Sequence, residues 1–184
     1  MIVNWVRGAS AGSRWRDLAD RQDITDVLNA YCECLDRMDL DALVELFTAD
    51  CSVDYGTGPW LQSTGRDALR RNLQELWRWS RTSHHLSNVS IEIAREGEGA
   101  RARALSYVLA WHEAADGSTA TMMGRYEDRL RKEGGRWWIA CRRQLLMGND
   151  EGFDVRINPF RGRIPPGTRS PEAEREEVEQ GAEE

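Results

Sequence analysis

Residues 100–147 read ARARALSYVLAWHEAADGSTATMMGRYEDRLRKEGGRWWIACRRQLLM. Apolar and polar side chains alternate along most of this stretch, a pattern typical of β-strands that bury one face. Glycine-containing turns divide it, and each turn indicates a hairpin between neighbouring strands. Because successive hairpins pair each strand with the one before it, the pattern predicts an antiparallel sheet. Its four long strands are expected at residues 83–95, 100–113, 119–132 and 136–147.

The region before the sheet has apolar residues at helical spacing. From Trp15 onward they recur at steps of three and four, which predicts a first helix. Asp39 is suited to cap a second helix that carries Leu40 to Phe47. A third helix is expected over residues 65–80, after a short strand at residues 51–55. Because these helices must bury their apolar faces against the sheet, the predicted class is α+β.

The patterns divide the chain into one domain and three flanking segments. After Gly148 the apolar residues alternate briefly and several prolines follow, which predicts an extended strap lying over the domain. The acidic end is expected to be disordered or a solvated helix. The predicted regions are a loose N-terminal arm at 1–14, the domain at 15–147, the strap at 148–168 and the acidic tail at 169–184.

Composition and charge exclude several classes of function. The chain has 184 residues, of which 40% are apolar, enough for one domain core, and its net charge is −6. The tail holds 2 basic and 7 acidic residues, so the rest is nearly neutral and nucleic-acid binding is disfavoured. No apolar run approaches the roughly 18–20 residues of a membrane span. The four cysteines lack CxxC spacing and no secretory signal is evident, so a cytoplasmic protein is expected.

Three histidines and one aspartate are the candidates for chemistry: His84, His85, His112 and Asp36. His84 and His85 are adjacent in a predicted strand and point to opposite faces, which disfavours a shared metal ion. Asp36 ends the first helix, where it is either an exposed loop residue or a carboxylate that holds an imidazole. The alternation of side chains along the strand leaves open which histidine faces the helices. Leu86 and Asn88 share the face of His84, whereas Val89, Ile91 and Ile93 share that of His85, so apolarity alone would point His85 inward.

Six segments resemble the SnoaL-like branch of the nuclear transport factor 2-like superfamily. They extend over about residues 15–147 and together are specific for it. The resemblance implies a cone-shaped, cystatin-like fold in which three helices pack on the concave face of a curved antiparallel sheet. The segments are DITDVLNAY at 23–31, LDRMD at 35–39, LFTAD at 46–50, SHHLSN at 83–88, GRYED at 124–128 and WWIA at 137–140.

Within this superfamily the chain looks most like small cofactor-free lyases: bile-acid 7α-dehydratase, scytalone dehydratase and hexachlorocyclohexane dehydrochlorinase. Those enzymes use an Asp–His pair as base, which the resemblance carries onto Asp36 and His84. His84 is preferred to His85 because Asn88 then falls in register. The helix tyrosine of the bile-acid enzyme matches Tyr31. The second histidine of scytalone dehydratase is similar in place to His112, and the arginine of the last strand to Arg142.

The resulting hypothesis is a dehydratase that acts on an apolar cyclic or polycyclic small molecule without cofactor or metal. His84, oriented by Asp36, would remove the proton, and Tyr31 would donate a hydrogen bond to the leaving oxygen or to an enolate. Substrate-binding residues would be His112, Asn88, Tyr55, Tyr126 and Arg142. The alternatives are an isomerase or cyclase with the same pair, and a non-catalytic binder or dioxygenase-β-like structural subunit.

The long strands carry apolar residues on both faces, and this predicts self-association. Tyr107, Leu109 and Trp111 alternate with Val108 and Ala110. One face can pack on the helices, so the other needs a cover. We expect a homodimer or higher homo-oligomer that packs through the outer face of the sheet, unless the strap covers that face.

Overall fold

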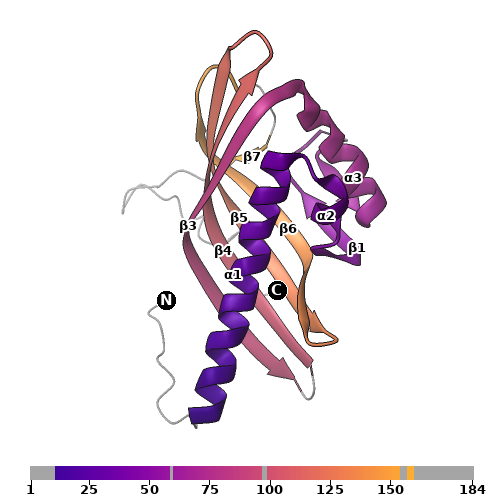
Figure 1. The fold of residues 1–184 in the computed structure, drawn as a ribbon, viewed down its shortest axis with the longest axis vertical. Helices are drawn as coiled ribbons and strands as arrows, with labels where there is room; N and C mark the ends of the chain where they lie inside the picture. Colours follow the sequence, from indigo (N-terminus) through magenta and orange to yellow (C-terminus); the bar gives the residue numbers. More distant parts are fainter. Residues whose placement is uncertain (1–10, 59, 97–98, 154–156, 160–184) are drawn as a thin grey trace, which may run out of the picture.

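A long curved sheet forms one layer of the protein and the helices form the other (Figure 1). The computed structural model describes residues 11–58, 60–96, 99–153 and 157–159. The elements are α1 (Ala11–Arg37), α2 (Leu40–Val44), β1 (Phe47–Asp54), β2 (Gln62–Thr64), α3 (Arg66–Leu73), the 3₁₀ helix η1 (Gln74–Arg78), β3 (Trp79–Glu96), β4 (Gly99–Ala114), β5 (Thr119–Glu133), β6 (Arg136–Asn149) and β7 (Asn158–Pro159).

The sheet has the strand order β2-β1-β6-β5-β4-β3, and β7 pairs with β6 on the edge that β1 also uses, beyond the end of β1. The three predicted hairpins are confirmed, since β3–β4, β4–β5 and β5–β6 are antiparallel. The sheet as a whole is mixed rather than antiparallel, because β1 runs parallel to β6, with Val53 opposite Arg142. Local turn signals predict hairpins only, so a parallel pairing between distant strands was missed.

Two predicted helices end earlier than expected because strand pairing takes their last residues. The second helix ends at Val44, and Phe47 instead opens β1 opposite Ile139 of β6. The third ends at Leu73 and tightens into η1, after which Trp79 pairs with Ala114 as the first residue of β3. In both cases tertiary hydrogen bonds outweigh the local helical pattern.

α1 crosses the sheet (Figure 1) and buries its apolar residues against it from Ile24 onward, as predicted, whereas Trp15 and Leu18 near its start are exposed. The helix begins at Ala11, so residues 11–14 of the expected arm are helical; residues 1–10 lie outside the described part. Asp20 fixes its first half from within the core, accepting bonds from Trp137 Nε1 at 3.0 Å and Lys132 Nζ at 2.5 Å. Burial opposes ionisation of Asp20, but these donors and Arg95 outweigh it and lower its pKa.

The junction between α1 and α2 is a tight turn that fixes the end of α1. Met38 has a φ of 53°, and its backbone N–H donates to the carbonyl of Leu35 at 3.0 Å. Asp39 caps α2 as predicted, accepting from the backbone N–H of Ala42 at 3.1 Å. The turn holds Asp36 in the last turn of α1, beside β3.

The described part of the strap lies against the core. Phe153 and Ile157 are buried, and Asn158 pairs with Leu145 in a short parallel ladder. Pro159 is the second and last residue of this short strand, so the extended strap predicted from the prolines pairs with the sheet here. The remainder of the strap and the acidic tail, residues 160–184, lie outside the described residues.

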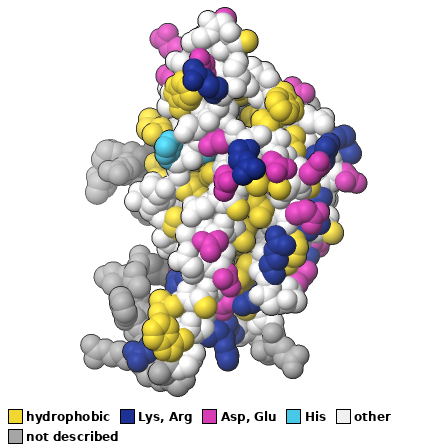
Figure 2. Space-filling view, viewed as in Figure 1, with side chains coloured by type: hydrophobic (Ala, Val, Ile, Leu, Met, Phe, Trp, Pro, Cys, Tyr) yellow, Lys and Arg dark blue, Asp and Glu magenta, His cyan; other side chains and the backbone are white. Residues whose placement is uncertain are grey.

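Figure 2 shows acidic and basic side chains mixed over the face that carries α1. None of the helices in residues 11–58, 60–96 and 99–153 is long and apolar enough to cross a bilayer.

Candidate functional site

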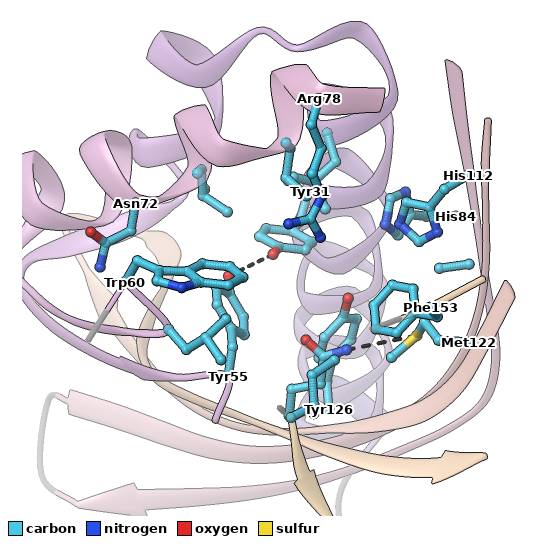
Figure 3. A pocket seen from close by; sticks show the side chains of 17 residues that line it. Tyr31, Tyr55, Trp60, Asn72, Arg78, His84, His112, Met122, Tyr126 and Phe153 are labelled. Atoms are coloured by element: carbon cyan, nitrogen blue, oxygen red, sulfur yellow. Dashed lines mark hydrogen bonds between the residues drawn. The ribbon is translucent and has the colours of Figure 1, made fainter. Parts of the chain in front are cut away.

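A cavity of about 80 Å³ lies between the helices and the sheet (Figure 3). α1, α3, η1, the sheet and the strap all contribute to its wall. Just over half of the lining residues are apolar, so an apolar ring would be in contact with hydrocarbon on several sides. The polar lining residues are Tyr31, Tyr55, Asn72, Arg78, His84, His112, Tyr126 and Gln144, and the apolar ones are Leu35, Trp60, Leu61, Leu73, Leu76, Ala110, Met122, Phe153 and Ile157.

Asp36 holds His84 by two bonds. The ring Nδ1 of His84 donates to Asp36 Oδ1 at 2.6 Å, and the His84 backbone N–H donates to Oδ2 at 3.0 Å. Thr82 Oγ1 adds a third donor to the carboxylate at 2.8 Å. Partial burial opposes ionisation of Asp36, but the bonds from His84 and Thr82 outweigh it and lower its pKa. Because Nδ1 faces the carboxylate, Nε2 is the nitrogen left for the cavity that His84 lines.

His84 rather than His85 faces the helices, as the resemblance implied. His85 is exposed and its Nε2 lies 2.9 Å from Ser83 Oγ. The alternation of apolar residues could not decide between the two histidines because β3 contains a β-bulge. Asn88 and Val89 together stand opposite the single residue Ser106, so inward-facing parity changes along the strand. His84 and Leu86 face inward before the bulge, and Ile91 and Ile93 do so after it.

Asn88 is part of this bulge and does not line the cavity. Its side chain is exposed and its backbone has a φ of 50°, in the left-handed region that asparagine tolerates better than most residues. The substrate-binding position expected for Asn88 is therefore corrected: its place in this structure is to turn the strand. The spacing between His84 and Asn88 resembles the family pattern, but this spacing does not reveal that the strand bulges at Asn88.

His112 is the second histidine of the cavity. It is 3% exposed, and its Nδ1 donates to the carbonyl of Ala120 at 3.3 Å. Its ring lies edge to face against His84, with centroids 5.5 Å apart. Burial, together with the nearby His84, lowers the pKa of His112 to about 4. At neutral pH it therefore presents an uncharged Nε2 that can accept a hydrogen bond.

Three tyrosines form the opposite part of the wall. The hydroxyls of Tyr31 and Tyr55 are 2.6 Å apart, as the dashed line in Figure 3 shows. Tyr126 packs edge to face on Tyr31, with ring centroids 5.8 Å apart. Burial raises the pKa of Tyr31 and raises those of Tyr55 and Tyr126 well above the ordinary value. All three are neutral phenols, and the Tyr31–Tyr55 pair retains one O–H to donate to a ligand.

Arg142 lies behind these tyrosines and not in the cavity wall. Its fully buried guanidinium binds Asp128 through two bonds, of 2.7 and 2.9 Å. Its Cζ atom lies 3.9 Å from the ring centroid of Tyr31 and 4.3 Å from that of Tyr126. The predicted contact of Arg142 with substrate is therefore corrected. Its charge is neutralised by Asp128, and the phenol rings separate it from the cavity.

Sequence reasoning missed other polar lining residues, notably Arg78 and Gln144. Arg78 was expected inside a third helix, and only the change to η1 and β3 brings it to the cavity. Gln144 was detectable in principle, because it has the parity of the inward-facing Arg142 in β6. Among the described residues, no group of three or more His, Cys, Asp or Glu side chains is arranged to hold a metal ion.

Comparisons with known proteins agree with this architecture. The chain is similar to a provisionally assigned scytalone dehydratase from Novosphingobium aromaticivorans, with 29% identity over 81% of this chain and 97% of that one and a TM-score of 0.72. A provisionally assigned aromatic ring hydroxylase from the same species is 26% identical over 72% of this chain and 93% of that one, with a TM-score of 0.64.

A hexachlorocyclohexane dehydrochlorinase is similar in fold alone. It shares 18% identity over 82% of this chain and 97% of that chain, with a TM-score of 0.62. These neighbours confirm the expected α+β fold of the nuclear transport factor 2 type. No curated protein matches the chain. A model of the SnoaL-like domain matches residues 16–143, which contain the helices and nearly all of the long sheet, and the chain therefore belongs to the SnoaL-like domain family.

Proposed function

We propose that this protein is a cofactor-independent lyase of the dehydratase type, which removes water from a small cyclic molecule with His84 as general base. The observation that carries the proposal is the 2.6 Å contact between Asp36 Oδ1 and His84 Nδ1 at the wall of a largely apolar cavity. A histidine held in this way has a fixed tautomer and a carboxylate ready to stabilise its protonated form.

The proposed reaction uses the polar groups that line the cavity. His84 Nε2 takes a proton from a substrate carbon next to a carbonyl, and Asp36 stabilises the imidazolium that forms. The Tyr31–Tyr55 pair donates to the oxygen on which negative charge develops. As the carbon–carbon double bond forms and the carbon–oxygen bond breaks, the imidazolium returns its proton to the departing hydroxyl. Water leaves, and His84 is again neutral.

The comparisons support a lyase. The similar protein of 29% identity carries the name of a dehydratase, and the family match extends over both Asp36 and His84. The alternative of a non-catalytic subunit gains no support from the second neighbour, whose name is that of an enzyme, an aromatic ring hydroxylase. The geometry favours the enzyme, since a structural subunit has no need of a carboxylate that orients a cavity-lining histidine.

The proposal is tested with the purified protein and a panel of cyclic β-hydroxyketones, each followed by mass spectrometry for loss of water. We expect enzyme-dependent dehydration of at least one single-ring member of the panel. In deuterated water, the matching ketones without the hydroxyl should exchange an α-proton at an enzyme-dependent rate. Exchange without dehydration would favour an isomerase with the same base, and neither reaction across the panel would contradict the lyase.

A further inference from the structure

Arg78 places a positive charge at the junction between the helical layer and the sheet. It is the last residue of η1, and β3 begins at the next residue. Figure 3 shows its guanidinium reaching from the helix into the cavity, toward Tyr31 and between Trp60 and the two histidines. No step of the proposed reaction uses this group.

The charge of Arg78 has no counter-ion in the described structure. None of the described residues that line the cavity is Asp or Glu, so Arg78 is the single lining side chain with a permanent charge. It forms no ion pair with a described residue, whereas Arg66, Arg70 and Arg81 on neighbouring elements bind Glu45, Asp41 and Glu113. Arg78 as a whole is exposed, but the partial desolvation of its guanidinium lowers its pKa, and Glu75 of the same helix only partly offsets this.

Two indole rings hold the guanidinium in place. Its Cζ atom lies 5.1 Å from the ring centroid of Trp79 and 5.7 Å from that of Trp60. Contacts with aromatic faces orient a guanidinium, but they accept no hydrogen bond from the N–H groups that lie in the guanidinium plane. The N–H donors of Arg78 are therefore held in place by the two indoles, and its positive charge is not neutralised by a described carboxylate. A guanidinium in this state can bind a ligand carboxylate through two parallel hydrogen bonds.

We propose that the ligand of this cavity is a single-ring carboxylate, whose carboxyl group binds Arg78 while its ring lies among the apolar lining residues. A volume of about 80 Å³ suits one ring better than a polycyclic compound. The inference rests on the proposed function, because His84 and the tyrosine pair line the same cavity as Arg78 and must reach the ring of the ligand whose carboxylate Arg78 binds. Arg78 then sets substrate specificity and takes no part in proton transfer.

The test is calorimetric binding of benzoate and of benzamide, a neutral ligand of the same shape. At about pH 8 the wild type should bind benzoate at least about 10-fold more tightly than benzamide. Arg78→Met should remove this preference by weakening benzoate binding about 10-fold or more while changing benzamide binding less than about 2-fold. Arg78→Lys should retain an intermediate preference, because it keeps the charge and loses the paired donors.

The matched control is Arg136→Met, since Arg136 also stacks on an indole, that of Trp138, but does not line the cavity. It should leave both affinities unchanged. If the wild type shows no preference for benzoate, or if Arg78→Met keeps it, the inference is wrong. If Arg78→Met weakens both ligands equally and lowers the melting temperature, Arg78 only supports the indoles and the inference is equally wrong.

The binding experiment is independent of turnover. His84→Ala should abolish dehydration and still prefer benzoate to benzamide. If the wild type dehydrates its substrate but shows no preference for benzoate over benzamide, only the carboxylate inference is overturned. A retained preference in a protein whose dehydration does not depend on His84 would overturn the proposed function alone.

Discussion

At the scale of single residues, Tyr31 is positioned to assist the reaction without being its base. Its hydroxyl contacts Tyr55 at 2.6 Å, and its buried phenol is neutral. We expect Tyr31→Phe to lower kcat by about 10- to 1000-fold, because one hydrogen bond to a developing charge is lost while His84 remains. KM should change less than kcat. Steady-state kinetics on the hydroxyketone that the enzyme dehydrates would measure both constants. An unchanged kcat would remove Tyr31 from the mechanism.

His112 couples the fold to pH. Its folded pKa is about 4, below the ordinary 6.5, so the unfolded chain takes up a proton first as the solution is acidified. The contribution of neutral, buried His112 is complete above pH 6.5 and is lost as the pH falls toward about 4, at a cost on the order of 3 kcal/mol.

Urea titrations across this range test the coupling. The free energy of unfolding of the wild type should fall with acidification more steeply than that of His112→Gln, which cannot titrate there. Subtracting the curve of His112→Gln from that of the wild type cancels the contribution of the other histidines and leaves that of His112. Parallel curves would mean that His112 is not neutral and buried in the native state.

At the scale of elements, the bulge in β3 decides which histidine enters the cavity. Asn88 has a φ of 50°, which glycine adopts without strain and β-branched residues avoid. Asn88→Gly should therefore keep the free energy of unfolding within about 0.5 kcal/mol, and Asn88→Val should cost about 1–3 kcal/mol. Ser87→Val is the control, because Ser87 is equally exposed but pairs regularly with Tyr107. Equal effects of the two valine substitutions would contradict this account of the bulge.

The bulge also marks where sequence reasoning stops. The alternation of apolar residues predicts β3 and β4 to within a few residues, because most of each strand is regular. It could not decide which face His84 occupies, because one inserted residue reverses the alternation after Ser87 and no composition signal accompanies it. The family resemblance selected His84 correctly, since it compares positions along the chain and needs no parity.

At the scale of the whole molecule, the outer face of the sheet carries exposed apolar side chains. Leu109 and Met123 stand opposite each other on β4 and β5, 45% and 53% exposed, and Met147 on β6 is 45% exposed. We expect a homo-oligomer that buries them, so light scattering at micromolar concentration should give a particle larger than 21.0 kDa. Met123→Glu should dissociate it, whereas Leu18→Glu, an exposed residue of α1, should not. A wild-type particle of 21.0 kDa would contradict this.

The architecture of the whole molecule was predictable because it follows from local signals repeated along the chain. Hairpin turns order β3 to β6, and the helical stripe of α1 is buried on the sheet. What could not be predicted depends on contacts between distant segments. The parallel pairing of β1 with β6, the conversion of residues 74–78 to η1 and the burial of Arg142 with Asp128 each require the assembled fold. Arg78 reaches the cavity for the same reason.

The central claim is that His84, held by Asp36, is the base, and a paired comparison of adjacent histidines tests it most directly. The rate of dehydration is measured for His84→Ala, His85→Ala and Asp36→Asn, each checked for folding by circular dichroism. We predict that His84→Ala is inactive, that His85→Ala keeps most activity, and that Asp36→Asn loses about 100-fold or more because asparagine cannot stabilise the imidazolium. An active His84→Ala beside an inactive His85→Ala, or full rates for all three variants, would contradict the account.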